Sequence, residues 1–109
     1  MKEFRDLVLC KEPPGGSSTR EIEVSLWEGK LTFSAVDYGP YVKAYWGDYD
    51  YEFWYWFDET ETRRLLEAIG GLEDPETALQ REFSGTAGCI ALEAFCRKHG
   101  ITYRFDSYV

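Results

Sequence analysis

Alternating hydrophobic and polar positions in the first half of the chain predict an antiparallel sheet. In residues 22–26 the apolar side chains occupy every second position, and residues 31–35 repeat the alternation. A period of two is typical of a strand with one buried face. Glu28-Gly29 lies between the two segments and favours a tight hairpin, since glycine adopts the positive φ angles that such turns need.

Two further strands are expected before residue 60. Residues 4–10 form a short apolar run, and residues 13–19 after them predict a flexible loop rich in Pro, Gly and Ser. Residues 49–57 give the strongest strand signal in the chain, because both of their faces are rich in residues that favour β structure. One face is aromatic throughout, and the other carries Asp50, Glu52, Trp54 and Trp56. Alternation does not tell which of the two faces contacts solvent.

The segment between these strands is punctuated by turn residues. Asp37 to Pro40 predicts a turn, and Gly47-Asp48 predicts a break in the chain. Residues 41–46 fit either a short strand or a helical turn.

The hydrophobic period changes after residue 57 and predicts three helices. The first begins with a capping-box pattern at Asp58 and ends at Gly70-Gly71. The second starts at Asp74-Pro75, an N-cap followed by the first helical residue. The third has apolar residues at helical spacing over 87–95, then three basic residues and Gly100, which suit a helix C-terminus.

The order of these elements predicts an α+β fold. An N-terminal antiparallel sheet of four or five strands is followed by three helices packed on one face and by a C-terminal strand. The last strand is expected at residues 101–105, where Ile, Tyr and Phe alternate with polar residues. A length of 109 residues fits one domain spanning residues 1–109.

The charge balance argues against a nucleic-acid partner. The chain has 12 Lys and Arg against 20 Asp and Glu, a net charge of −8, and no run of basic residues. Phosphate backbones are repelled by such a field. The same field speeds encounter with a cationic protein, although acidity also serves solubility alone, and both interpretations stay open.

The cysteines and the hydropathy predict a cytoplasmic protein without a membrane partner. No stretch approaches the about 20 apolar residues that span a bilayer, and the N-terminus lacks the apolar run of a signal peptide. Cys10, Cys89 and Cys96 are odd in number and form no CxxC pair, which favours free thiols over a disulfide framework.

No pattern of catalytic or metal-binding residues stands out, so the chain is predicted not to be an enzyme and to use no cofactor and no metal. His99, the single histidine, falls at a helix C-terminus, where it complements the helix dipole. A metal site needs several His or Cys ligands at workable spacing. The alternative is a small hydrolase or ligand-binding protein that uses a carboxylate pair, such as Glu52 with Asp37, in an aromatic pocket.

The segment from residue 48 to residue 58 is the candidate partner-binding site. Its non-aromatic face combines acids with two tryptophans, which suits a Lys- or Arg-rich protein through ion pairs and cation–π contacts. In the alternative, Trp54 and Trp56 pack on the Pro/Gly loop or on the first strand. The predicted contact residues are Asp48, Asp50, Glu52, Trp54, Trp56 and Asp58.

Three motifs carry a resemblance to a known family. Asp37-Tyr38-Gly39 fits a D-x-G motif, residues 47–53 fit G-x-x-x-Y-E-Y/F before a Leu-rich helix, and residues 100–105 fit a Gly-Ile/Val step with an aromatic strand. Over residues 30–107 the chain resembles a family of small, acidic, uncharacterised bacterial proteins. Some of its members look like immunity proteins of polymorphic-toxin or contact-dependent inhibition systems. Trp54-Tyr55-Trp56 departs from the family pattern, which has smaller or mixed residues there.

The resemblance implies an antitoxin, that is, a cytoplasmic immunity protein that binds and occludes one cognate toxin domain without chemistry of its own. Many such toxins are nucleases with basic clefts, which an acidic toxin inhibitor fills as a phosphate mimic. The alternative is a housekeeping protein-interaction domain with no toxin partner, or a homodimer formed through the aromatic strand, because edge strands invite pairing.

Overall fold

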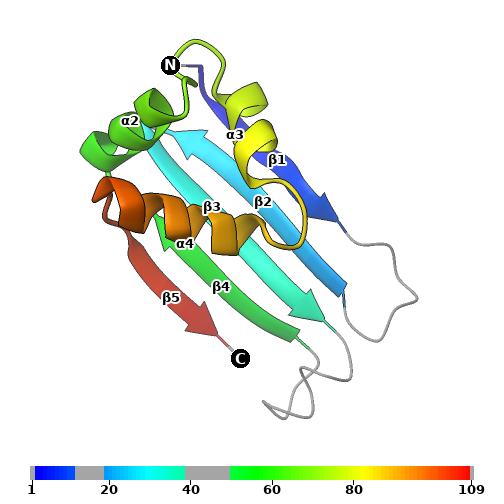
Figure 1. The fold of residues 1–109 in the computed structure, drawn as a ribbon. Helices are drawn as coiled ribbons and strands as arrows, with labels where there is room; N and C mark the ends of the chain where they lie inside the picture. The colour runs from blue at the N-terminus through cyan, green and yellow to red at the C-terminus, as the bar shows by residue number, and fades with distance from the viewer. Residues whose placement is uncertain (1, 12–18, 39–49, 109) are drawn as a thin grey trace.

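Five antiparallel strands form one sheet whose order in space follows their order in the chain (Figure 1). The structure, a computed structural model, describes residues 2–11, 19–38 and 50–108. The strands are β1 (Phe4–Lys11), β2 (Thr19–Trp27), β3 (Lys30–Tyr38), β4 (Asp50–Trp56) and β5 (Arg104–Tyr108). β1 and β5 therefore form the two edges, and β4 lies between β3 and β5.

Three helices cover one face of this sheet and leave the other face open (Figure 1). They are α2 (Glu59–Ala68), α3 (Pro75–Phe83) and α4 (Gly88–His99), and all three come between β4 and β5 in the chain. The predicted α+β fold, with three helices and a C-terminal strand, is confirmed.

Local capping chemistry fixes where the helices begin and end. Asp58 accepts a hydrogen bond from the backbone N–H of Glu61 at 2.8 Å, and Asp74 accepts one from Thr77 at 3.2 Å. These bonds satisfy N–H groups that have no partner within the helix. Gly100, at φ 67°, ends α4 in the left-handed conformation. The predicted caps are confirmed.

The hairpin between β2 and β3 has the predicted two-residue turn. Glu28 and Gly29 both have positive φ, 52° and 76°, and Trp27 faces Lys30 across the turn. Two consecutive positive φ values define the type I′ turn, whose twist matches that of the flanking strands. This turn sets the register of the whole hairpin.

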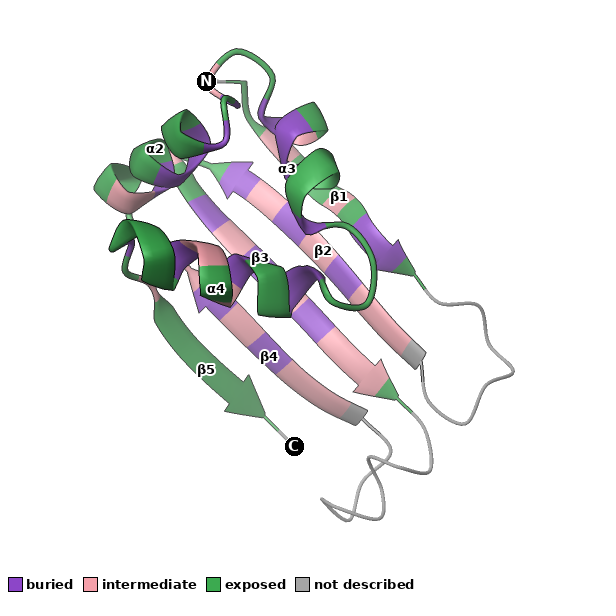
Figure 2. Ribbon diagram, viewed as in Figure 1, coloured by how far each residue is buried: buried purple, intermediate pink, exposed green. Residues whose placement is uncertain are grey.

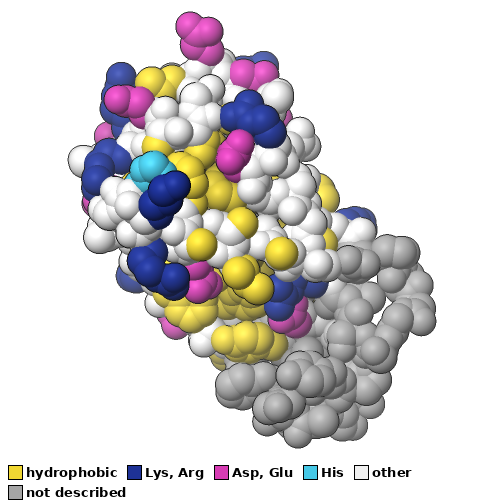
Figure 3. Space-filling view, viewed as in Figure 1, with side chains coloured by type: hydrophobic (Ala, Val, Ile, Leu, Met, Phe, Trp, Pro, Cys, Tyr) yellow, Lys and Arg dark blue, Asp and Glu magenta, His cyan; other side chains and the backbone are white. Residues whose placement is uncertain are grey.

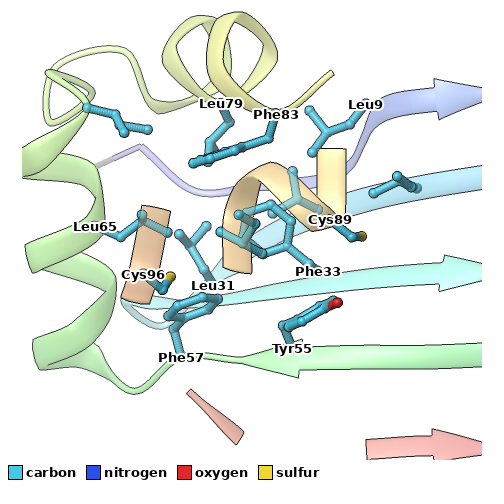
Figure 4. Close-up of a cluster of buried hydrophobic side chains, with 14 of the residues drawn as sticks. Leu9, Leu31, Phe33, Tyr55, Phe57, Leu65, Leu79, Phe83, Cys89 and Cys96 are labelled. Atoms are coloured by element: carbon cyan, nitrogen blue, oxygen red, sulfur yellow. The ribbon is translucent and has the colours of Figure 1, made fainter. Parts of the chain in front are cut away.

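The core lies between the sheet and the helices, and alternation along β2, β3 and β4 builds its floor (Figures 2 and 4). Phe33 contacts Phe57 and Phe83 edge to face, with ring centroids 5.8 and 6.1 Å apart. The largest helix residues in this core are Leu65, Leu66, Leu79, Phe83 and Leu92, all almost fully buried. The free cysteines Cys10, Cys89 and Cys96 are buried too, as predicted for the last two.

The last strand begins three residues later than predicted. Ile101 is buried, and its N–H donates to the carbonyl of Cys96 at 2.9 Å, so it belongs to the end of α4. Tyr103 packs on Phe57, with ring centroids 5.4 Å apart. The apolar alternation that predicted a strand at 101–105 thus reflects, in its first half, a helix cap packed on the core.

The turn predicted at residues 37–40 is wrong in its first half. Asp37 and Tyr38 are the last residues of β3, where they pair with Tyr51 and Asp50 of β4. Residues 39–49, with the break and the short element predicted there, lie outside the described residues, as does most of the loop expected at 13–19.

Candidate functional site

The two faces of β4 have different neighbours. Its odd-numbered residues, among them Phe53 and Tyr55, are buried under the helices, and its even-numbered residues point to the open face of the sheet. Glu52, Trp54 and Trp56 on that side are half-buried. The structure therefore brings three of the six predicted contact residues together on one strand face.

Trp54 and Trp56 stack on each other, with ring centroids 5.9 Å apart and ring planes 16° from parallel. On the β3 side Trp54 lies opposite Ser34 and Trp56 opposite Thr32. Small hydroxyl side chains at these two positions leave the indoles room on the sheet. The alternative that the indoles pack on β1 is wrong, because β1 and β4 are separated by two strands.

A cation already contacts this tryptophan pair from β5. The Arg104 guanidinium carbon lies 4.4 Å from the Trp56 ring centroid, within cation–π range. Asp106 lies opposite Trp54 on the same strand. Trp54, Trp56 and Arg104 are called the tryptophan cluster below.

A second arginine–indole contact lies on the same face, toward the other edge. Arg5 of β1 places its guanidinium carbon 4.4 Å from the ring centroid of Trp27, whose side chain is about half exposed. The strand register puts four acids and four bases on the open face of the described strands: Glu21, Glu23, Glu52, Asp106, Arg5, Lys11, Lys30 and Arg104. This part of the surface is aromatic and mixed in charge rather than purely acidic.

The three remaining predicted contact residues lie elsewhere or cannot be placed. Asp58 follows β4 and is exposed, but its carboxylate caps α2. The backbone of Asp50 belongs to β4, while its side chain and all of Asp48 lie outside the described part of the chain.

A shallow groove of about 560 Å³ opens beside the tryptophan cluster. Trp56 and Asp58 line it, so it joins two of the predicted contact residues to the end of β5. Its other exposed walls come from Lys30, Thr102 and Arg104. The groove offers a partner one carboxylate, two cations and an indole.

The carboxylate pair of Glu52 with Asp37 is not formed. Asp37 faces Tyr51 across the β3–β4 pairing, whereas Glu52 faces Val36, so the two acids point to opposite faces of the sheet. Asp37 instead forms a two-pronged ion pair with Arg20, Nε to Oδ1 at 2.5 Å and Nη2 to Oδ2 at 2.7 Å. Hydrolysis by that pair of acids is excluded.

The Arg20–Asp37 pair is a feature that sequence reasoning missed. Arg20 also donates to the carbonyl of Thr86 at 3.0 Å, which ties the sheet to the loop before α4. The hydrogen bond from Asp37 raises the pKa of Arg20. The signal was present in the sequence, because a hairpin centred on Glu28-Gly29 places residues 20 and 37 opposite each other.

The buried titratable groups of the core are held in their neutral forms. Burial raises the pKa of Cys89 to about 11 and that of Cys96 to about 12. Burial, with a hydrogen bond to the Glu93 carboxylate, also raises the pKa of Tyr55. These shifts are opposite to those of reactive thiols and phenols. Among the described residues no three His, Cys, Asp or Glu side chains are placed to hold a metal ion.

A second groove of about 560 Å³ lies between the ends of α2 and α4, where basic side chains surround the single histidine (Figure 3). Arg63, Arg64 and His99 line it. Arg64 is engaged there: it bonds to Glu61 and donates to the carbonyls of His99 and Gly100. It therefore serves the C-terminus of α4.

None of the helices in the described residues is long and apolar enough to cross a bilayer. The chain matches none of the family models, curated proteins or solved structures with which it was compared. The likeness to immunity proteins therefore stays a prediction from its motifs.

Proposed function

We propose that this chain is a protein-binding domain that docks its partner on the open face of the sheet, centred on the tryptophan cluster. The observation that carries the proposal is the stacked pair Trp54–Trp56, on the sheet face that carries no described helix. Indole rings flanked by Arg side chains are the groups that most often dominate the energy of protein interfaces. The core does not need them, since the opposite face of the same strand supplies it.

The partner we propose is a toxin domain, which the chain inhibits in the cytoplasm by covering its active site. Two observations support this choice: the net charge of −8 and the motif resemblance over residues 30–107. A cationic surface on the toxin would meet Glu21, Glu23, Glu52 and Asp106 on the open face. The bases on the same face then fix the orientation of the complex rather than its strength.

Co-expression with the protein encoded immediately upstream tests this function. The two chains are expected to purify as a complex, and the double variant Trp54→Ala/Trp56→Ala is expected to bind at least about 30-fold more weakly, the loss typical of one hot-spot residue. The matched control is Ile90→Ala, which removes an exposed apolar side chain from α4 on the opposite side of the molecule.

Two outcomes would contradict the proposal in different places. A complex that tolerates loss of both indoles means that binding uses another surface. Absence of a complex with the upstream product, with the chain folded, removes the toxin as partner.

A further inference from the structure

β5 is an edge strand whose five residues are all exposed (Figure 2). It pairs with β4 on one side only, and no helix lies above it (Figure 1). Phe105 is 48% exposed and Tyr108 is 69% exposed. An edge of this kind presents unpaired backbone N–H and C=O groups to any strand that approaches.

The opposite edge of the sheet is less suited to pairing. β1 has two register irregularities against β2, and Asp6 within it has a positive φ of 54°. Bulges twist an edge away from a regular partner. The homodimer predicted through the aromatic strand fails for another reason: β4 already pairs with a strand on each side. β5 is therefore the strand available to a partner.

We propose that β5 pairs antiparallel with β5 of a second copy of this chain, in the register that sets Arg104 of each copy opposite Asp106 of the other. Phe105 then lies opposite its own counterpart, on a two-fold axis perpendicular to the sheet. The result is one continuous ten-stranded sheet, twice the five strands of one copy. This contact is separate from the open face and does not need the partner proposed above.

Charge selects this register from its neighbours. Only shifts by two residues keep the same face of both sheets on the same side. A shift in one direction sets Asp106 opposite Asp106, and a shift in the other sets Arg104 opposite Arg104. Opposite charges directly across a strand pair stabilise it and like charges destabilise it. The first of these shifts would pair all five residues of β5, so the acids prevent the longest overlap.

Both faces of the extended sheet support the same register. On the open face, Trp56 and Arg104 of one copy continue into Asp106 of the other, whose cross-strand neighbour is Trp54. On the helix-bearing face, Phe105 packs on Tyr55 with ring centroids 5.2 Å apart, so two facing Phe105 rings join the aromatic clusters of both copies. The Asp106 carboxylate already lies along the strand, where it accepts the N–H of Ser107 at 2.9 Å.

Charge-swap variants of the full chain test the register directly. Sedimentation equilibrium up to millimolar concentration is expected to show a reversible dimer of the unmodified chain. Arg104→Asp sets two acids against each other, and Asp106→Arg sets two bases against each other. Each single variant changes two attractions into two repulsions, which corresponds to a loss of on the order of tenfold in dimer affinity.

Mixing the two single variants gives the sharpest readout. Arg104→Asp in one copy and Asp106→Arg in the other restore both opposite-charge pairs, so the mixture is expected to form a heterodimer where neither variant dimerises alone. The double variant Arg104→Asp/Asp106→Arg is expected to dimerise with itself. Lys98→Asp and Glu73→Arg carry the same charge changes at exposed positions away from β5 and should leave the dimer intact.

A chain that stays monomeric at all concentrations overturns the proposal. So does a mixture of the two folded single variants that associates no better than either one. Circular dichroism and the swapped double variant separate loss of pairing from loss of folding.

Discussion

Neighbouring residues on β4 have opposite environments, and the contrast separates what holds the fold from what the fold presents. Tyr55 is 2% exposed beneath the helices, while Trp54 and Trp56 on either side of it are half-buried on the uncovered face. Burial against three helices explains every aromatic residue on one side of the strand. It explains none on the other, where a polar alternation would serve the sheet equally well.

The largest expected effect breaks the core side of this contrast. Phe33→Ala should lower the free energy of unfolding by about 3–5 kcal/mol, because it leaves a cavity beside Phe57 and Phe83. The next residue, Ser34, faces the other way, and Ser34→Ala should change stability by less than about 0.5 kcal/mol. Urea unfolding of both variants checks the difference, and equal losses would mean that the open face is packed too.

Alkaline pH should weaken the covered side next most strongly. The folded thiols titrate near 11 and 12, whereas free thiols have a pKa of about 8.5, so above that pH the unfolded chain binds fewer protons than the folded one. The free energy of unfolding should therefore fall with rising pH, by on the order of 1–2 kcal/mol between about pH 8 and 10. Chemical denaturation across this range measures it, and the double variant Cys89→Ala/Cys96→Ala should show a shallower decline.

Removing the ion pair at the rim of the core should have a smaller effect. Asp37→Asn leaves Arg20 with only the Thr86 carbonyl and should cost about 1 kcal/mol, because both side chains keep part of their surface in water. Glu52→Gln, next to it in register on the opposite face, is the matched control and should be neutral in thermal unfolding. A loss of equal size at Glu52 would show that the open face carries structural charge as well.

The smallest expected effect sharpens the open-face side. Trp54→Thr and Trp56→Thr should each lower the free energy of unfolding by less than about 1 kcal/mol, since threonine suits a strand and each indole loses only a half-buried stacking contact. Heteronuclear NMR spectra should keep the pattern of the unmodified chain outside the neighbouring strands. A collapse of the spectrum would assign the indoles to the fold rather than to binding.

The local elements of this fold are readable from the sequence because their signals are local. Alternation marks β2, β3 and β4, Asp58 and Asp74 mark the starts of two helices, and Gly100 marks an end. The start of β5 was misplaced because Ile101 repeats the strand period while it serves a helix cap. A period of two over three apolar residues does not distinguish these cases.

The candidate site was only partly predictable, since its composition depends on non-local pairing. The sequence identifies Glu52, Trp54 and Trp56 as one face, but the contribution of β5 requires knowing that Arg104 returns beside Trp56 after three helices. For the same reason, the acidic patch expected from residues 48–58 proves to be bordered by cations among the residues that the structure places. Face assignment also excluded the pair of Glu52 with Asp37, which sequence proximity had left open.

The insertion of three helices between β4 and β5 has a consequence for the order of folding. β2 and β3 meet through a two-residue turn, whereas β5 must wait until 47 intervening residues, 57 to 103, have collapsed onto the sheet. Closing so long a loop is slow relative to closing a hairpin, so β5 should dock late. Its backbone amides should then exchange with heavy water sooner than those of β3, and a nascent chain would expose the edge of β4 until the last segment has left the ribosome.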